Sequence, residues 1–378
     1  MEQLLNKFQQ IAAEPLKTAQ YWKEKTGKKV VGCMGLYVRE EIFHAAGLLP
    51  IVILEKDSPI LKAQAHVQSY MCGYIRSVTD QALAGDLDFI DCIISHDCCH
   101  TIRMTTEIIK RNAPGIKDIQ PIFLPVTIKK AESWTYTLQE LSFLINKAEK
   151  LAARSVTEDD LRQSIQIYNK HRRLLKRLYQ LRRDKPGIIS ARQVSNIVKA
   201  SMLMPKEEHN AMLEPLLEAM ENKTVEANNK IPVIVSGSLC ETCDEYVLDI
   251  LEEVGGVVVD DDLYVGSRYF ATEVDESLSP LTALASAYVN MVPPCPTRHD
   301  PDNNLSDYLV DMAKRAKAKG IISVIVKFCE AHYYSYLTFR RRIKEFNIPE
   351  YLIETEHEGV SPAQIKTRLQ SFIESIRG

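Results

Sequence analysis

Short apolar runs alternate with stretches of helical periodicity in two separate parts of the chain. The runs cover residues 29–33, 50–54, 89–94 and 119–124 in the first part, and 231–235, 257–259, 321–326 and 351–353 in the second. Most are rich in β-branched residues and bounded by glycine, proline or polar residues, which is typical of buried strands. The alternation of strands with helices predicts parallel sheets covered by helices. We therefore expect an α/β protein with two Rossmann-like lobes.

Strand signals almost vanish between Lys129 and Met220, where apolar residues recur at helical spacing. Thr157, followed by three acidic residues, is a typical helix start. A chain of 378 residues is too long for one ordinary core. We predict three parts, which are a first lobe with an N-terminal helix (1–128), a mainly helical region (129–229) and a second lobe (230–378).

The two predicted lobes look like diverged copies of one unit. The first strand of each leads into a turn that contains a glycine, Gly35 in one lobe and Gly237 in the other. The third strand of each is followed by cysteine, at Cys98 and Cys99 in one lobe and at Cys329 in the other. The pattern predicts an internal repeat that brings these cysteines to equivalent places.

Charge and hydropathy exclude several classes of protein. The net charge of −3 leaves no electrostatic footprint for nucleic acid, and the basic clusters at 170–173 and 340–342 are typical of solvated helix faces. No apolar run approaches the ~20 residues that span a bilayer, and the N-terminus lacks the apolar core of a signal peptide. We expect a cytoplasmic protein with neither nucleic-acid nor membrane partners, in which nine cysteines do not form a disulfide framework.

Cysteines at three places are expected to face a cleft. Parallel sheets bind ligands beyond the carboxyl ends of their strands, where Cys98 or Cys99 and Cys329 lie. Cys72 stands at an apparent helix start, where main-chain N–H groups favour a thiolate. Spacing alone does not distinguish such ligands from small buried side chains. We expect burial in the core for Cys33, Cys92 and Cys295.

Three other patterns carry weaker signals. Cys240 and Cys243 form a CxxC pair that could be redox-active, but no second pair completes a zinc site. The run Asp260–Asp262 could bind a divalent ion and is more often a polar strand exit. The segment 32–35 lacks the third glycine of a dinucleotide fingerprint and the Lys-Ser/Thr of a phosphate loop, so we expect no nucleotide site in this chain.

Four segments together resemble the superfamily of 2-hydroxyacyl-CoA dehydratases and benzoyl-CoA reductases. They are residues 32–50, 71–76, 97–101 and 327–330, and their order and separation fit along nearly the whole chain. Three C-terminal segments, 259–269, 294–298 and 352–357, look more like a benzoyl-CoA reductase subunit than a dehydratase subunit.

The resemblance implies a [4Fe–4S] cluster held by three cysteines, with one iron left open to a non-protein ligand. By position the ligands are Cys72, Cys99 and Cys329. The family usually has one cysteine followed by Asp-Thr, whereas this chain has Cys98-Cys99-His100-Thr101. Counting back from Thr101 favours Cys99, with Cys98 as the alternative.

The resemblance also implies an iron–sulfur subunit of an ATP-dependent benzoyl-CoA reductase. It passes single low-potential electrons to the ring of an aromatic acyl-CoA in anaerobic aromatic degradation. Its partners are a homologous cluster-bearing subunit and a separate iron–sulfur activator that hydrolyses ATP. The alternatives are a 2-hydroxyacyl-CoA dehydratase subunit, an ATP-coupled double-cubane cluster reductase and a noncatalytic α/β scaffold.

Ring reduction also needs protons and a place for the coenzyme. Three histidines close in sequence to the proposed ligands are candidate proton donors, namely His96, His100 and His332. Arg268, Arg298 or a lysine is expected to meet the phosphates of coenzyme A.

Overall fold

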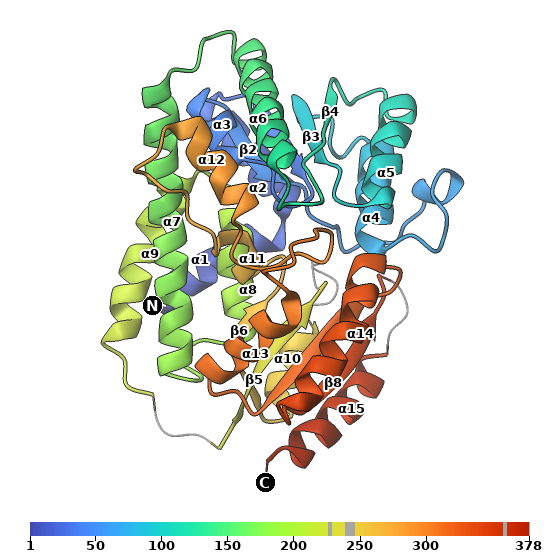
Figure 1. Cartoon of the computed structure of the whole chain (residues 1–378), viewed down its shortest axis with the longest axis vertical. Coiled ribbons are helices and arrows are strands. Elements are labelled where there is room, and N and C mark those ends of the chain that lie inside the picture. Colours follow the sequence, from blue (N-terminus) through green and yellow to red (C-terminus); the bar gives the residue numbers. More distant parts are fainter. Residues whose placement is uncertain (226–228, 239–245, 358–360, 378) are drawn as a thin grey trace.

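Two four-stranded parallel sheets form the centre of the molecule (Figure 1). The computed structural model describes residues 1–225, 229–238, 246–357 and 361–377. The strand orders are β2-β1-β3-β4 and β6-β5-β7-β8, so the two sheets share one topology, as the internal repeat predicts. The predicted α/β class with two lobes is confirmed.

The strands lie close to their predicted positions. The first sheet comprises β1 (Val30–Met34), β2 (Leu49–Val52), β3 (Cys92–His96) and β4 (Ile119–Ile122), and the second comprises β5 (Ile231–Gly237), β6 (Gly256–Asp262), β7 (Gly320–Val326) and β8 (Glu350–Thr355). β3 begins at Cys92 rather than at Phe89, because residues 85–90 close the preceding helix through turns such as the bond from the Ile90 amide to the Leu87 carbonyl.

The helices of the first lobe are α1 (Glu2–Ala13), α2 (Pro15–Thr26), α3 (Glu40–Ala45), α4 (Gly73–Ala84) and α5 (His100–Asn112). The predicted single N-terminal helix is two helices, since Pro15 has no N–H to continue the first and starts the second instead. The middle region, as far as the structure describes it, has helices and no strand, namely α6 (Ala131–Ala152), α7 (Glu158–Asp184), α8 (Ala191–Ser201) and α9 (Lys206–Glu221).

The helices of the second lobe are α10 (Tyr246–Glu253), α11 (Ser267–Phe270), α12 (Pro280–Val289), α13 (Leu305–Arg315), α14 (Glu330–Glu345) and α15 (Pro362–Ser375). α14 begins directly after its N-cap, Cys329. α11 and α12 have no counterpart in the prediction. α12 shares a hydrophobic core with strands of the first sheet, and the three-part division at residues 128 and 229 stays a prediction.

The long helix α7 runs beside both lobes (Figure 1). Its start is the capping box that Thr157 predicts, with the Asp160 amide donating to the Thr157 hydroxyl at 3.1 Å. The Ser164 hydroxyl donates to the Glu41 carbonyl of the first lobe at 2.8 Å, and the Tyr179 hydroxyl donates to Asp261 of the second at 2.7 Å. α7 therefore ties the lobes together through buried polar contacts.

Expectations about charged runs hold only in part. The cluster at 340–342 lies at the surface, and so do Lys170 and Arg173, whereas His171 and Arg172 are buried because α7 lies between other elements. The run Asp260–Asp262 is neither an ion site nor a strand exit, since all three residues are buried inside β6. Each of these carboxylates pairs with an arginine instead, namely Asp260 with Arg183 (2.8 Å), Asp261 with Arg182 (2.8 Å) and Asp262 with Arg268 (2.7 Å).

Among the described helices, none combines the length and the apolar character that crossing a bilayer requires.

Candidate functional site

A cavity of about 360 Å³ lies where the two lobes meet. Its wall is built from the residues that follow four strands, with Gly35 after β1, Cys98–Ile102 after β3, Gly237–Ser238 at the end of β5 and Phe328–His332 after β7. The carboxyl ends of both sheets thus open into one space, which is where parallel sheets bind ligands. Five cysteines line it, Cys72, Cys98, Cys99, Cys295 and Cys329.

Three of these cysteines are helix N-caps. Cys72 precedes α4, Cys99 precedes α5 and Cys329 precedes α14. The amides of the first turn have no partner within a helix, and the helix dipole is positive there, so an anionic sulfur is stabilised. The amides that favour the three thiolates are those of Ile75, Ile102 and His332, each three residues beyond its cysteine.

In the cysteine pair after β3, Cys98 donates a hydrogen bond and Cys99 accepts it. A hydrogen bond from the Cys98 thiol is the largest influence on Cys99 and lowers its pKa to about 6, and the Thr101 hydroxyl, 3.1 Å from the sulfur, acts in the same direction. Donating that bond raises the pKa of Cys98 well above its ordinary value. Cys99 is therefore the residue of this pair with the more stable thiolate.

At the other two N-caps, Cys72 and Cys329, burial is the largest influence on the pKa of the thiol. It raises the pKa of Cys72 well above its ordinary value, and the neighbouring Cys329 and Cys99 thiols add to the effect. It raises the pKa of Cys329 to about 11, although the His332 amide and the Ser238 hydroxyl favour its thiolate. A positively charged partner stabilises the thiolate form most where thiols are desolvated and lie near one another at helix N-termini.

Two of the three cysteines expected in the core are found there. Cys33 and Cys92 are each 1% exposed and lie off the cavity wall. Cys295, in the loop between α12 and α13, is half-buried and lines the cavity, so the expectation that it is a core thiol is wrong.

The donor set fits an iron–sulfur cluster better than a single metal ion. Among the described residues, no three His, Cys, Asp or Glu side chains converge closely enough to hold one ion. A four-iron cluster presents its irons at separate corners, so its thiolate ligands need not converge on a point. Three cysteines from both lobes around one cavity suit that requirement.

The three candidate histidines lie in different places. His100 is exposed and His332 half-buried, and both line the cavity. His96 is not among the lining residues and is 2% exposed at the end of β3, with its ring centroid 5.6 Å from that of Tyr37. Burial lowers the pKa of His96 to about 4 and that of His332 to about 3, so both rings are neutral near pH 7.

Neither arginine proposed for coenzyme A is free at the surface. The Arg268 side chain is buried, where it donates to both oxygens of Asp262 at 2.7 Å and to the Pro294 carbonyl at 2.8 Å. The expectation that Arg268 meets phosphates is therefore replaced by a structural role. Arg298 is half-buried, with its guanidinium 4.4 Å from the centroid of the Tyr288 ring.

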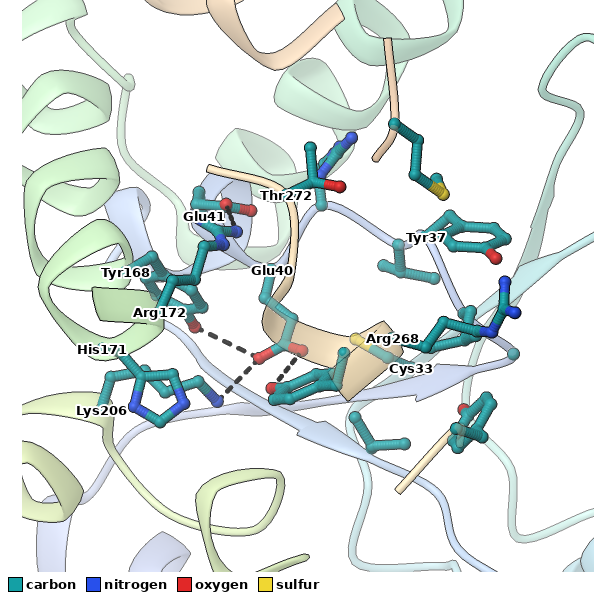
Figure 2. Close-up of a pocket in the computed structure, with 18 residues that line it drawn as sticks. Cys33, Tyr37, Glu40, Glu41, Tyr168, His171, Arg172, Lys206, Arg268 and Thr272 are labelled. Carbon is teal, nitrogen blue, oxygen red and sulfur yellow. Dashed lines mark hydrogen bonds and ion pairs between the residues drawn. The ribbon is translucent and has the colours of Figure 1, made fainter. Parts of the chain in front are cut away.

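A second cavity of about 60 Å³ adjoins the first and shares Gly35, Tyr37 and Arg268 with it (Figure 2). Figure 2 shows the Glu40 carboxylate at its centre, where it accepts hydrogen bonds from Lys206 at 2.9 Å and from two tyrosine hydroxyls. Glu41 pairs with Arg172 beside it. This buried network was not predicted, because residues 39–46 have the pattern of an ordinary helix.

The CxxC pair of Cys240 and Cys243 lies outside the residues that the structure describes.

Comparisons with known proteins agree with the resemblance seen in the sequence. The chain is 29% identical to the beta subunit of (R)-phenyllactyl-CoA dehydratase from Clostridium sporogenes, over 99% of each chain. It is 29% identical to the beta subunit of lactoyl-CoA dehydratase from Anaerotignum propionicum, over 100% of this chain and 99% of that one. It is 28% identical to a benzoyl-CoA reductase subunit from Thauera aromatica, over 95% of this chain and 94% of that one.

The family model for the D-component of 2-hydroxyglutaryl-CoA dehydratase matches residues 35–376, which include seven of the eight strands and every cysteine of the cavity. The chain therefore belongs to the 2-hydroxyglutaryl-CoA dehydratase D-component family, within the superfamily that also includes benzoyl-CoA reductase subunits.

Proposed function

We propose that the chain is a cluster-bearing subunit of an oxygen-sensitive enzyme that transfers single electrons to an acyl-CoA thioester. The observation that carries this proposal is the meeting of three helix-capping cysteines, from two lobes, on the wall of one cavity. Cys72, Cys99 and Cys329 would hold a [4Fe–4S] cluster there. Such a cluster supplies electrons one at a time at a potential that nicotinamide does not reach.

The chain's own residues prepare this site in two ways. The N-termini of α4, α5 and α14 place the three sulfurs on the cavity wall, and their first-turn amides would stabilise the thiolates once a cluster is bound. The buried network around Glu40 anchors α3, which follows the turn at Gly35 and Tyr37 on the cavity wall. A rigid wall of this kind keeps solvent reorganisation small during electron transfer.

Two reactions fit this arrangement. Reduction of the ring of benzoyl-CoA or a related aromatic thioester is what the C-terminal segments of the sequence indicate, and a benzoyl-CoA reductase subunit is one of the relatives. Dehydration of a 2-hydroxyacyl-CoA is the second candidate, favoured by the similarity to two dehydratase beta subunits over the full length of the chain. Both reactions begin with one low-potential electron.

The proposal includes two kinds of protein partner. The relatives are named as subunits, which supports assembly with a homologous cluster-bearing chain. A separate iron–sulfur activator would hydrolyse ATP and deliver the electron. Of the histidines, His100 is the proposed proton donor because it is exposed on the cavity wall, while neutral His332 would accept or orient a hydrogen bond.

Activity with a panel of thioesters separates the two reactions. The anaerobically purified complex would be assayed with reduced activator, ATP and both aromatic acyl-CoA and 2-hydroxyacyl-CoA esters. Ring reduction consumes two electrons for each product molecule, whereas dehydration recycles its electron and consumes only catalytic amounts of reductant. A protein without iron and sulfide, when made under strict anaerobiosis in cells that assemble clusters, would refute the proposed function altogether.

A further inference from the structure

The cavity of about 60 Å³ beside the proposed cluster site has more cations than carboxylates on its wall. Its charged lining residues are Arg39, Arg172, Lys206, Arg268, Glu40 and Glu41. Glu40 pairs with Lys206 at 2.9 Å, and Glu41 pairs with Arg172 (Figure 2). Arg268 pairs with Asp262, which is not itself a lining residue, at 2.7 Å. The cation left without a carboxylate of its own is Arg39.

Arg39 is buried, and its guanidinium lacks partners. It is the N-cap residue of α3 and is 7% exposed. Two of its guanidinium nitrogens, Nε and Nη2, are buried and make no hydrogen bond within the described part of the chain. Glu41 is the carboxylate that acts on Arg39, and it is already held by Arg172. A buried charge that is neither paired nor hydrogen-bonded is strongly unfavourable, so the site calls for a counter-ion.

Neighbouring groups add to the positive charge. Arg172 and Arg298 both repel Arg39. Arg298 is half-buried against the Tyr288 ring, and its Nε likewise has no hydrogen-bond partner among the described residues. Burial lowers the pKa of Arg39 to about 10, so the guanidinium is still charged at neutral pH. Three guanidinium groups therefore act on one another here, with Glu41 as the carboxylate among them.

The two nitrogens without partners have a specific geometry. Nε and Nη2 carry the two N–H bonds that leave one edge of the guanidinium in parallel. This is the edge that binds both oxygens of a carboxylate at once. A spherical anion such as chloride compensates the charge but does not accept along both directions. The unpartnered edge of Arg39 therefore favours a planar oxyanion.

The volume of the cavity limits the size of this anion. A buried water molecule needs at least roughly 10–15 Å³ of such a cavity, so about 60 Å³ admits only a few non-hydrogen atoms. Formate, acetate and bicarbonate are of that size. The phosphates of coenzyme A, with the ribose that they carry, are too large.

We propose that Arg39 binds one small carboxylate-type anion, of the size of formate, acetate or bicarbonate, in the cavity of about 60 Å³. The anion accepts both N–H bonds of the Nε–Nη2 edge and compensates the charge that the chain leaves unpaired. Binding is reversible, and no covalent bond forms or breaks. The inference does not depend on the proposed function, because Cys72, Cys99 and Cys329 do not line this cavity.

Anion-dependent stability tests this proposal. The whole chain is unfolded in urea with increasing sodium formate, in a buffer free of other carboxylates and bicarbonate, and sodium chloride keeps the ionic strength constant. The matched control is Arg177→Met, because Arg177 is partly exposed and pairs with Glu221. In wild type and control, we expect the urea midpoint to rise with formate, as for a ligand specific to the folded state. Arg39→Met should bind formate at least roughly tenfold more weakly, because charge-assisted hydrogen bonds are lost.

A lysine variant separates charge from geometry. Arg39→Lys retains the charge but not the two parallel N–H bonds, so it should lose the preference for formate over chloride. Without formate, Arg39→Met should be at least as stable as wild type, because an unpaired buried cation has been removed.

Two results would overturn the site. One is a wild-type urea midpoint that is the same in formate and in chloride, and the other is an equal rise with formate in wild type and Arg39→Met. If neither Arg39 variant folds, NMR of ¹³C-labelled formate with the wild-type chain decides. Saturable broadening of the formate line that acetate reverses supports the site, and an unchanged line refutes it.

Discussion

The two lobes have the same strand order, and yet the cavity cysteine that precedes the third strand is placed differently in each. Cys72 caps α4 directly, whereas Cys295 precedes α13, whose N-cap is Asn304. The cysteines after the third strands are alike, since Cys99 and Cys329 both cap helices. Sheet topology therefore determines which loops reach the cavity. The length of the loop before the helix then determines whether a sulfur lies at the helix N-terminus or receives its hydrogen bonds from elsewhere in the loop.

The outer strands next to β1 and β5 differ as well. β2 (Leu49–Val52) is apolar throughout, while β6 ends in three buried aspartates that pair with arginines. The first lobe holds this strand by hydrophobic contacts and the second by ion pairs to α7 and α11. We therefore expect the stability of the second lobe to be more sensitive to the loss of a single charged residue than that of the first.

The largest effect is expected when cluster ligands are removed from either lobe. Cys72→Ser, Cys99→Ser and Cys329→Ser should each lose most of the bound iron, because a thiolate at a helix terminus is lost. Iron and sulfide are measured on anaerobically reconstituted protein. Cys92→Ser, in β3 and off the cavity wall, should retain wild-type iron. Equal loss in all four variants would mean that the cysteines support folding rather than ligation.

The glycines at the ends of β1 and β5 should respond unequally to alanine. A Cβ on Gly237, at φ 137°, would lie 1.8 Å from the Val324 carbonyl oxygen, so the backbone must move. A Cβ on Gly35, at φ 84°, meets its nearest atom at 3.3 Å. We expect Gly237→Ala to lower the free energy of unfolding by roughly 4 kcal/mol or more, and Gly35→Ala by about 1 kcal/mol. Similar denaturant midpoints for both variants would contradict this difference.

Removal of one arginine from α7 should strongly destabilise the second lobe. Arg182 is 2% exposed and pairs with Asp261, so Arg182→Met leaves a buried carboxylate with less compensation and should cost about 3–5 kcal/mol of unfolding free energy. Arg177, on the same helix, is partly exposed and pairs with Glu221. Arg177→Met should change stability by less than ~1 kcal/mol in urea unfolding. Equal losses of unfolding free energy in Arg182→Met and Arg177→Met would show that burial of the ion pair does not affect its contribution.

Acid should weaken the helical region that joins the lobes. Burial lowers the pKa of His209 to about 3, below the ~6.5 of an unfolded chain. Between these values the unfolded state binds more protons, so stability falls as the pH falls, by at most about 1.4 kcal/mol per pH unit from this group. His209→Gln should flatten the dependence of urea unfolding on pH between 6.5 and about 4. An unchanged slope would assign the acid sensitivity to other buried groups.

Much of the fold was predictable because its signals are local. Apolar runs, turn glycines and the capping box at Thr157 act over a few residues, and the strands they predict are present with small shifts. Cys99 and Cys329 were placed from the same local pattern, since both follow a strand. The arginine partners of Asp260–Asp262 were not predictable, because sequence periodicity does not show which charged side chains of other elements pack against a strand.

The sequence by itself determined that the chain alternates strands and helices, that it contains two related lobes, and that three cysteines stand at strand ends or helix starts. Only the tertiary structure decided that five cysteines share one cavity and that Cys295 is among them. The reason is physical. Periodicity reports the environment of a side chain along its own element, whereas the loop that carries Cys295 has no periodicity, and its place is set by the packing of one lobe against the other.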